Sequence, residues 1–145
     1  MNDSGLEEIL RDRYCTYRRL HGKKKIYKEV PVFSRSVDFV EYDSHKKKLT
    51  AIEFKIKDWK RAIRQLNEIS TCFDFLVLCI PKPKTEKCLL NIKDKCTQMG
   101  IGLFVWEEKT DSFSWVCEAM NLSDIWHIQK KQIINYLKEQ EANHE

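Results

Sequence analysis

No stretch of eighteen consecutive apolar residues occurs in this sequence of 145 residues, so we expect no membrane-spanning helix. Residues 1–5 lack a basic segment followed by an apolar one, and we therefore expect no secretory signal and a cytoplasmic location. The six cysteines include no C-x-x-C pair, and the four histidines are too far apart in the sequence to predict a zinc site. In a reducing cytoplasm we expect these cysteines to be free, buried thiols.

Internal repeats, low-complexity segments and linkers are absent as well, which predicts one domain over residues 1–145. We place its core at about residues 4–117 and a further C-terminal helix at about residues 123–139. Hydrophobic residues make up 42% of the chain, which is enough to form a real core. The net charge is only +4, but the lysines are clustered. A basic surface favours a phosphate-rich partner such as nucleic acid, although clustered lysines can equally serve solubility alone.

Hydrophobic periodicity predicts an α/β fold. Helical spacing predicts helices over residues 4–20, 58–69, 83–99 and 123–139. Strands are predicted over residues 26–33, 37–42, 49–56, 73–80, 101–106 and 113–117, and Pro31 places the first of them at an edge or a bulge. The near-continuous apolar run at 73–80 is typical of a strand buried on both faces. This order of elements predicts a sheet of mixed direction flanked by helices.

A candidate site lies on the third predicted strand, whose residues alternate in character. Ile52 and Phe54 fall on one face, while Glu53 and Lys55 project side by side from the other. Asp38 lies on the preceding strand, and a hairpin brings it near Glu53 only if the register of the two strands matches. Two carboxylates with an amine beside them could hold a divalent cation. The plain alternative is a solvent-exposed strand face on which none of these groups has a role.

Basic residues follow on the helix that Asp58 is expected to cap. Together with the residues just before this helix, they could contact phosphates and so position a duplex without reading its sequence. The alternative is an ordinary solvated helix face. The candidate nucleic-acid-binding residues are Lys57, Lys60, Arg61, Arg64 and Gln65.

Asp38, Glu53 and Lys55 together resemble the signature of the PD-(D/E)xK nuclease superfamily, which has the restriction-endonuclease-like fold. Val37 precedes Asp38 where the name of the signature has proline, a substitution that is common among such proteins. The resemblance covers roughly residues 6–106. It implies a core of αβββαβ type with the site at one edge of the sheet, and Mg²⁺ or Mn²⁺ as the cofactor.

A more specific likeness is carried by the segment at residues 53–59. With Gln65, Asp74 and the strand entry at residues 100–103, this segment is similar to a small bacterial branch of the superfamily that is associated with DNA repair. Gln65 matches a glutamine sometimes found on the helix after the ExK strand. The resemblance therefore implies DNA as the partner.

The resemblance also implies a role for each residue of the site. Asp38 and Glu53 would be metal ligands, and Lys55 would orient or activate the attacking water. An acid from the first helix often joins the site in such enzymes, and the candidates here are Glu7 and Glu8. Without the resemblance, the sequence also allows Glu29 to be an acid of the metal site.

Phosphodiester hydrolysis explains why these residue types belong together. The reaction adds negative charge to the scissile phosphate, and Mg²⁺, which prefers oxygen ligands, polarises the phosphoryl oxygen. Asp38 and Glu53 supply such oxygens, and the backbone carbonyl of Phe54, between the two motif positions, could supply another. Lys55 can stabilise the developing charge. The resemblance, together with this chemistry, implies an Mg²⁺-dependent DNA endonuclease.

Two other readings stay open. The first is a catalytically inactive module on the same scaffold that binds nucleic acid or serves assembly. The second is an interaction role for the last predicted helix, whose Trp126, Ile128, Ile133 and Ile134 exceed what one narrow apolar stripe needs. Such a helix could form a homodimer, which would suit paired cuts on two strands, or it could complete the core of the monomer.

Overall fold

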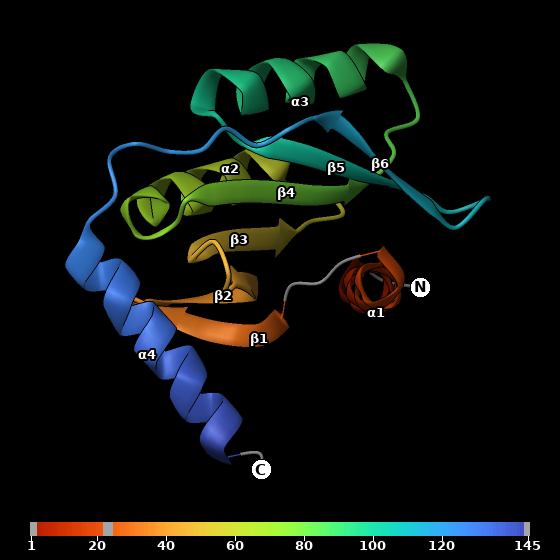
Figure 1. Ribbon diagram of the computed structural model, residues 1–145. Coiled ribbons are helices and arrows are strands. Elements are labelled where there is room, and N and C mark those ends of the chain that lie inside the picture. The colour runs from red at the N-terminus through yellow and green to blue at the C-terminus, as the bar shows by residue number, and fades with distance from the viewer. Residues whose placement is uncertain (1–2, 22–24, 144–145) are drawn as a thin grey trace.

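The computed structural model describes residues 3–21 and 25–143, which form a six-stranded sheet with helices on both faces (Figure 1). The helices are α1 (Asp3–His21), α2 (Trp59–Glu68), the short 3₁₀ helix η1 (Ser70–Cys72), α3 (Glu86–Met99) and α4 (His127–Asn143). The strands are β1 (Lys25–Val32), β2 (Arg35–Asp43), β3 (Lys48–Phe54), β4 (Phe75–Pro81), β5 (Gly102–Glu107) and β6 (Ser112–Cys117).

The strands lie in the sheet in the order in which they occur in the chain. The β1–β2, β2–β3 and β5–β6 pairs are antiparallel, whereas β3–β4 and β4–β5 are parallel and are joined by helical crossovers. The predicted α/β class, the mixed sheet and the αβββαβ order of the first six main elements are therefore confirmed. Pro31 lies on β1, which is an edge strand, as its missing N–H requires.

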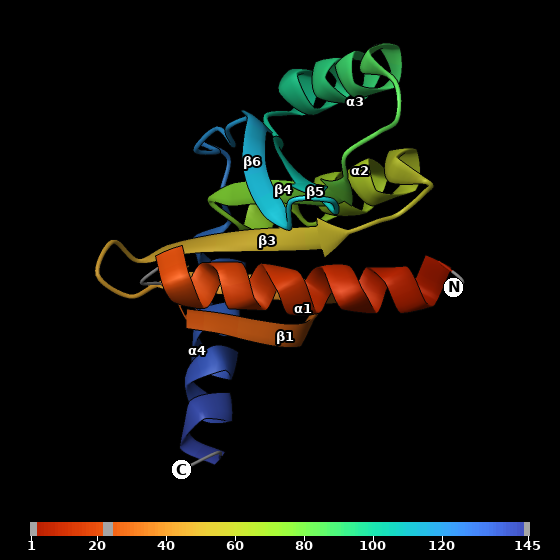
Figure 2. The ribbon, with the colours of Figure 1, turned by 90° about the vertical axis from the view of Figure 1, so that its right-hand side faces the viewer.

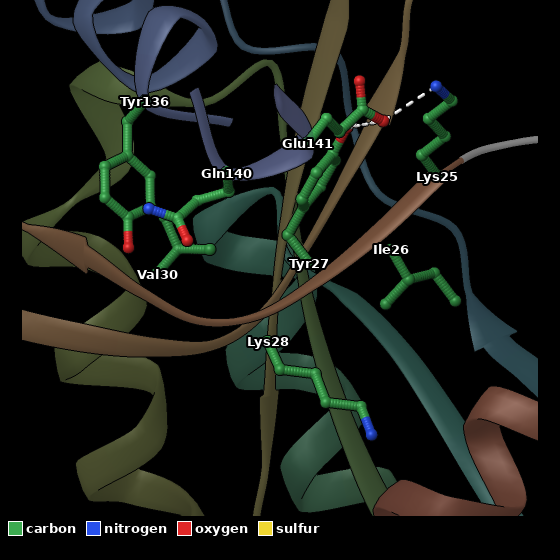
Figure 3. Close-up of a pocket in the computed structure, with 8 residues that line it drawn as sticks. All are labelled: Lys25, Ile26, Tyr27, Lys28, Val30, Tyr136, Gln140 and Glu141. Carbon is green, nitrogen blue, oxygen red and sulfur yellow. Dashed lines mark hydrogen bonds and ion pairs between the residues drawn. The ribbon is translucent and has the colours of Figure 1, made fainter. Parts of the chain in front are cut away.

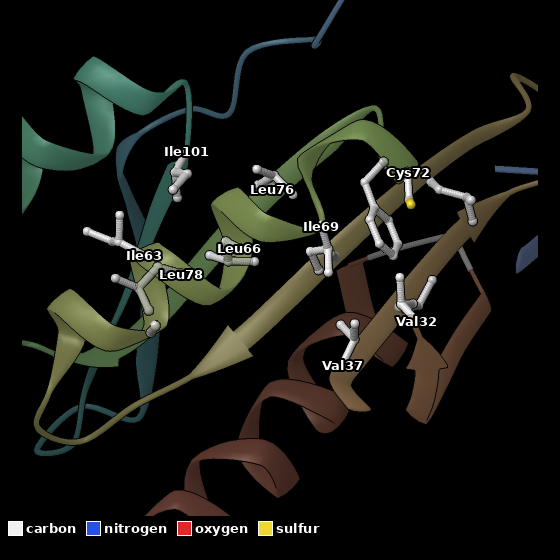
Figure 4. Packing of buried hydrophobic residues seen from close by; sticks show 14 of the residues in the cluster. Val32, Val37, Ile63, Leu66, Ile69, Cys72, Leu76, Leu78 and Ile101 are labelled. Carbon is white, nitrogen blue, oxygen red and sulfur yellow. The ribbon is translucent and has the colours of Figure 1, made fainter. Parts of the chain in front are cut away.

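Each face of the sheet carries its own hydrophobic cluster. On one face, Leu10, Tyr14 and Cys15 of α1 pack against alternate residues of the strands, and Figure 2 shows α1 crossing this face. On the other face, α2, α3 and α4 cover a larger cluster, part of which is drawn in Figure 4. Strand β4 is buried along its middle on both faces, as its apolar run predicts. The alternation predicted for β3 is confirmed, because Ile52 and Phe54 join the α1 cluster and Ala51 joins the other.

Aromatic rings fill the cluster under α1. The Tyr14 ring meets the Phe54 ring edge-on at a centroid distance of 5.3 Å and the Phe104 ring at 6.0 Å. The Phe39 and Phe54 rings also meet edge-on, with centroids 4.8 Å apart. Edge-to-face packing places the positive ring edge against the negative face, which stabilises the contact of α1 with the middle of the sheet.

Several predicted boundaries of helices and strands were wrong. Helix α3 begins at Glu86 rather than at residue 83, because the Thr85 hydroxyl accepts a hydrogen bond from the backbone N–H of Cys88 and caps the helix there. Asp58 does occupy the N-cap position of α2, but its side chain makes no capping hydrogen bond, and its backbone is left-handed with φ of 36°. Strand β3 ends at Phe54 rather than at residue 56.

The last helix starts four residues later than predicted, at His127. Backbone hydrogen bonds from Leu122 to the Asp74 carbonyl, at 2.8 Å, and from Trp126 to the Thr71 carbonyl, at 2.7 Å, hold the preceding segment against the body of the protein. Ser123 therefore caps no helix. Within the described residues, none of the helices has the length and apolar character needed to cross a membrane.

Candidate active site

The predicted site residues meet where the ladder between β2 and β3 stops. The last paired residues of that ladder are Phe39 and Ile52, so Asp38 and Glu53 lie one step beyond it. On the other side of β2, Asp38 also falls in a gap of the register, because its counterpart Glu29 has a left-handed backbone with φ of 51°. Left-handed backbone is unfavourable for a residue with a side chain, and such outliers often accompany a functional site.

Asp38 is held by one hydrogen bond on each carboxylate oxygen. The backbone N–H of Phe54 donates to Oδ2 at 2.9 Å, and the Arg11 guanidinium of α1 donates to Oδ1 at 3.1 Å. The Asp38 side chain is 13% exposed. Asp38 is therefore fixed beside the Glu53–Lys55 segment from two directions, by the backbone of β3 and by a side chain of the helix that crosses the sheet.

Glu53 is buried and lies against Asp38. Burial raises the pKa of Glu53 from its ordinary 4.5 to about 8, with the negative charge of Asp38 and a hydrogen bond between the two side chains adding to the effect. The positive charge of Lys55 acts in the opposite direction on the same pKa. The backbone N–H of Lys55 donates to the Cys79 carbonyl at 3.1 Å, which continues the pairing with β4 and holds Lys55 at the strand end. The structure thus brings Asp38, Glu53 and Lys55 together.

A cavity of about 210 Å³ opens beside Glu53 on the face of the sheet covered by α2. Gln65 of α2 and Arg35 of β2 line it together with Glu53, and the role predicted for Gln65 stays a prediction. Arg35 forms an ion pair with Glu68 at the end of α2. The cavity therefore combines a carboxyl group, an amide and a guanidinium at one end of the sheet.

The other predicted residues lie around this centre. Lys60, Arg61 and Arg64 are exposed on α2, and Lys57 is exposed in the loop before it. The Lys60 ammonium lies 5.7 Å from the centre of the Trp59 ring, which packs against the core. These placements leave the four basic residues at the surface.

The acids predicted from the first helix differ in position. The Glu7 carboxylate lies 4.0 Å from the Arg11 guanidinium that binds Asp38, whereas Glu8 is exposed. Glu29 also reaches Arg11, at 3.7 Å. The backbone N–H of Phe54 donates to Asp38, and the role of the Phe54 carbonyl as a metal ligand stays a prediction.

Sequence reasoning missed Arg11 and Arg35. The contact of Arg11 with Asp38 spans 27 positions of the chain, so no local pattern indicates it. The only hint is the helical spacing of Glu7 and Arg11, which places them on one face of α1. Arg35 lies in the short connection between two predicted strands, and nothing in its neighbourhood distinguished it from a turn residue.

The donor set suits a hard cation with few protein ligands. No group of three or more His, Cys, Asp or Glu side chains among the described residues is placed to hold a metal ion. Two carboxyl groups do meet, and burial together with the charge of Asp38 raises the pKa of Glu53, so a second negative charge is unfavourable there. A divalent cation would remove that penalty, and Mg²⁺ commonly binds through one or two carboxylates while keeping several waters. Asp38 and Glu53 therefore fit Mg²⁺ or Mn²⁺ as its two protein ligands.

Other polar groups outside this site have structural partners. Glu41, which is 4% exposed, accepts hydrogen bonds from the Tyr14 hydroxyl at 3.0 Å and from Arg18 Nε at 2.7 Å. Burial, followed by the charge of Glu41, raises the pKa of Tyr14 well above its ordinary value. This trio anchors α1 on β2.

A larger hollow of about 650 Å³ lies elsewhere, between the edge strand β1 and α4 (Figure 3). Glu141 crosses it, accepting a hydrogen bond from the Tyr27 hydroxyl at 2.8 Å and pairing with Lys25 at 2.7 Å. Hydrogen bonding from Lys25 and Tyr27 lowers the pKa of Glu141. The lining of this hollow includes neither Asp38 nor Glu53.

No family model matches the chain, and no curated protein sequence matches it. Among solved structures, the chain is similar to the SPO1766 protein of unknown function from Silicibacter pomeroyi, with a TM-score of 0.67 at 18% identity, over 93% of this chain and 85% of that one. This likeness shows a shared fold.

Two further structures overlap more loosely. A repair endonuclease from Pyrococcus abyssi matches with a TM-score of 0.48 at 20% identity, over 74% of this chain and 48% of that one. SfsA from Pyrococcus furiosus, in complex with Ca²⁺, matches with a TM-score of 0.39 at 14% identity, over 81% of this chain and 62% of that one. Overlaps this loose do not establish a common fold.

Proposed function

We propose that this protein is a divalent-cation-dependent nuclease that hydrolyses phosphodiester bonds of DNA with Asp38, Glu53 and Lys55. The observation that carries the proposal is the meeting of two carboxyl groups, one of them on the buried residue Glu53, beside Lys55 at one end of the sheet. The pairing of Asp38 with Arg11 suits a structural role, but Glu53 is buried, and a buried negative charge is costly unless a cation compensates it. Perturbed carboxyl pairs of this kind are typical of functional sites.

The residues of the chain have distinct tasks in this proposal. Asp38 and Glu53 bind and orient the cation, which when bound supplies Lewis-acid polarisation of the scissile phosphate. Lys55, whose charge already acts on Glu53, stabilises negative charge that develops on the phosphate during attack by water. Gln65, across the cavity, can donate and accept hydrogen bonds and so position the attacking water or a phosphate oxygen.

The exposed basic residues of α2 and of the loop before it supply the contacts to the nucleic-acid backbone in this proposal. Phosphate contacts of this kind position a duplex without specifying its sequence. They also release counterions, so binding should weaken as the salt concentration rises. The residues concerned are Lys57, Lys60, Arg61 and Arg64.

A cleavage assay tests the proposal directly. Linear, supercoiled, single-stranded and branched DNA, and RNA, are incubated with Mg²⁺, Mn²⁺ or EDTA and with the wild type, Glu53→Gln or Lys55→Met. We expect cleavage of at least one DNA substrate with the metals only, and a loss of about a hundredfold or more in each variant, because each removes a charge used in the transition state.

Matched controls separate chemistry from surface charge. Glu108 and Lys109 are exposed in the turn between β5 and β6, so Glu108→Gln and Lys109→Met change the same charges away from the site. These variants should cleave as the wild type does. Salt-sensitive DNA binding without cleavage in any metal would instead favour the alternative, a non-catalytic binding module on the same scaffold.

The predicted homodimer stays a prediction. Trp126, just before α4, and Ile128, in its first turn, are 55% and 72% exposed, whereas Ile133 and Leu137 are buried and complete the core of the monomer. Sedimentation at two protein concentrations, with Ile128→Lys beside the wild type, would decide. A dimer through this helix should dissociate in the variant, because a lysine would place a charge in the apolar contact.

A further inference from the structure

Arg11 is the cation that balances the acidic side of the site. Its guanidinium lies 3.1 Å from Asp38, 3.7 Å from Glu29 and 4.0 Å from Glu7. These acids come from three different elements, α1, β1 and β2. Because Arg11 touches all three of them, it neutralises negative charge that would otherwise accumulate beside the buried Glu53.

The position of Arg11 conflicts with that of a bound divalent cation. One oxygen of Asp38 accepts from Arg11 and the other from the backbone N–H of Phe54, so both are already engaged. A cation that coordinates Asp38 would lie within a few ångströms of the guanidinium, and like charges at that distance repel strongly. Cation and guanidinium therefore compete for the same carboxylate.

One nitrogen of the Arg11 side chain also lacks a hydrogen-bond partner in this position. This atom, Nε, is buried and, alone among the buried side-chain nitrogen and oxygen atoms that the structure describes, has no hydrogen-bond partner. The side chain as a whole is 29% exposed, so part of it already reaches solvent. A planar guanidinium with several donors matches the oxygens of a phosphate better than any other side chain does.

We propose that Arg11 is an exchangeable cation that occupies Asp38 in the metal-free protein, yields it to the divalent cation, and then binds a phosphate of the nucleic acid. This inference rests on the proposed function. The exchange makes the cation and the nucleic acid bind cooperatively. The cation displaces Arg11 from Asp38 and so frees it for a phosphate, and the phosphate holds Arg11 away from Asp38 and so frees the carboxylate for the cation. By linkage, the nucleic acid raises the affinity for the cation by the same factor as the cation raises the affinity for the nucleic acid.

Calorimetric titration with Ca²⁺, an oxygen-preferring cation used here as the probe, tests the competition without any turnover. In the absence of nucleic acid, Arg11→Met should bind Ca²⁺ about threefold to tenfold more tightly than the wild type, since a competing ion pair has been removed. Arg13→Met is the matched control, because Arg13 lies on the same helix but pairs with Asp111, at 3.5 Å. It should leave the Ca²⁺ affinity unchanged.

Anisotropy of a short fluorescein-labelled DNA duplex tests the exchange. For the wild type, Ca²⁺ should strengthen duplex binding, and this coupling should shrink severalfold in Arg11→Met. Arg11→Lys keeps the charge but loses the planar fork, so it should retain the Ca²⁺ affinity of the wild type and only part of the coupling. Far-UV circular dichroism and a thermal melt establish that each variant is folded.

The outcomes separate the two proposals. Unchanged or weaker Ca²⁺ binding in folded Arg11→Met, or coupling as large as in the wild type, would overturn the exchange while leaving the nuclease proposal standing. If the wild type binds no Ca²⁺, or if Glu53→Gln binds Ca²⁺ as tightly as the wild type does, the metal site itself is absent. Both proposals are then overturned.

Discussion

The backbone N–H of Phe54 donates a hydrogen bond of 2.9 Å to Oδ2 of Asp38, across the point where β2 and β3 cease to pair. A side chain here replaces the missing backbone partner, which satisfies the N–H of the strand end and fixes the carboxylate in one orientation. The hydrogen bond from Phe54 needs only an acceptor, whereas the ion pair with Arg11 and the binding of a cation need the negative charge of Asp38. The two tasks can therefore be separated by substitution.

Asp38→Asn should keep the fold and lose the cation. Its amide oxygen can still accept from Phe54, so the free energy of unfolding in urea should fall only by what the ion pair with Arg11 contributes, less than about 1 kcal/mol. Asp38→Ala removes the acceptor as well and should cost about 1 to 2 kcal/mol. Both variants should lose calorimetric Ca²⁺ binding. Equal Ca²⁺ affinity in Asp38→Asn and the wild type would contradict the proposed role of the charge.

The raised pKa of Glu53 makes stability depend on pH. Because the folded pKa is about 8 and the ordinary value is 4.5, the folded state holds a proton that the unfolded state has lost between these limits. This contribution to stability is fully present below about pH 4.5 and is lost as the pH rises through about 8. Its size is on the order of a few kcal/mol.

Urea unfolding between about pH 5 and about pH 8 measures this dependence. The wild type should lose stability relative to Glu53→Gln across the window, because glutamine does not ionise. Saturating Mg²⁺ should reduce the loss at the high end, since the cation binds the ionised pair. Parallel curves for the two proteins without metal would show that the buried carboxyl has an ordinary pKa.

Lys130 ties α4 to the sheet through a buried carboxylate. Its Nζ lies 2.8 Å from Oδ2 and 3.1 Å from Oδ1 of Asp74, which is 2% exposed and also accepts from the backbone N–H of Leu49 at 2.8 Å. Lys48 is the only other cation near this carboxylate among the described residues, at 3.8 Å. Lys130→Met should therefore leave a buried charge with weak compensation and cost about 3 kcal/mol.

Lys131 provides the control for that substitution. It is the next residue and is exposed, so Lys131→Met changes the net charge equally without touching Asp74. Its unfolding midpoint in urea should stay within the error of the wild type. Similar midpoints for both variants would indicate that the ion pair with Asp74 contributes nothing to the attachment of α4.

The cysteines should react in two groups. All six are free, as the sequence predicts, but only four of them are buried: Cys15, Cys72, Cys79 and Cys96. Burial raises the pKa of each of these four thiols, which suppresses the reactive thiolate. Cys88, near the start of α3, is exposed and should react first.

Labelling with a chromogenic disulfide reagent under native conditions checks this order. Cys88→Ser should remove the fast phase, and the four buried thiols should react only when urea unfolds the protein. Cys117, which is partly exposed and whose thiol lies 3.7 Å from the Ile101 carbonyl, should react at an intermediate rate. A fast phase that survives in Cys88→Ser would mean that a buried thiol is reached by local opening.

Much of the fold was predictable because it rests on short-range periodicity. The alternation around Glu53 assigns neighbouring residues to opposite faces, and a strand admits no other arrangement. The apolar run of β4 required burial on both faces, which only the middle of a helix-covered sheet provides. The sequence placed Asp38 and the Glu53–Lys55 segment on two adjacent strands joined by a short turn, but the register that brings them near each other came from the structure.

What the sequence pattern could not supply depends on contacts between distant segments. Ser123 looked like a helix cap, but hydrogen bonds from Leu122 and Trp126 to the segment around Asp74 outweigh that local preference and delay α4 to His127. Arg11 reaches Asp38 only because α1 crosses the sheet at that point, and the same contact decides how the site is neutralised without a cation. Local periodicity determines which face a side chain occupies, while the packing of helices on the sheet determines which charges meet there.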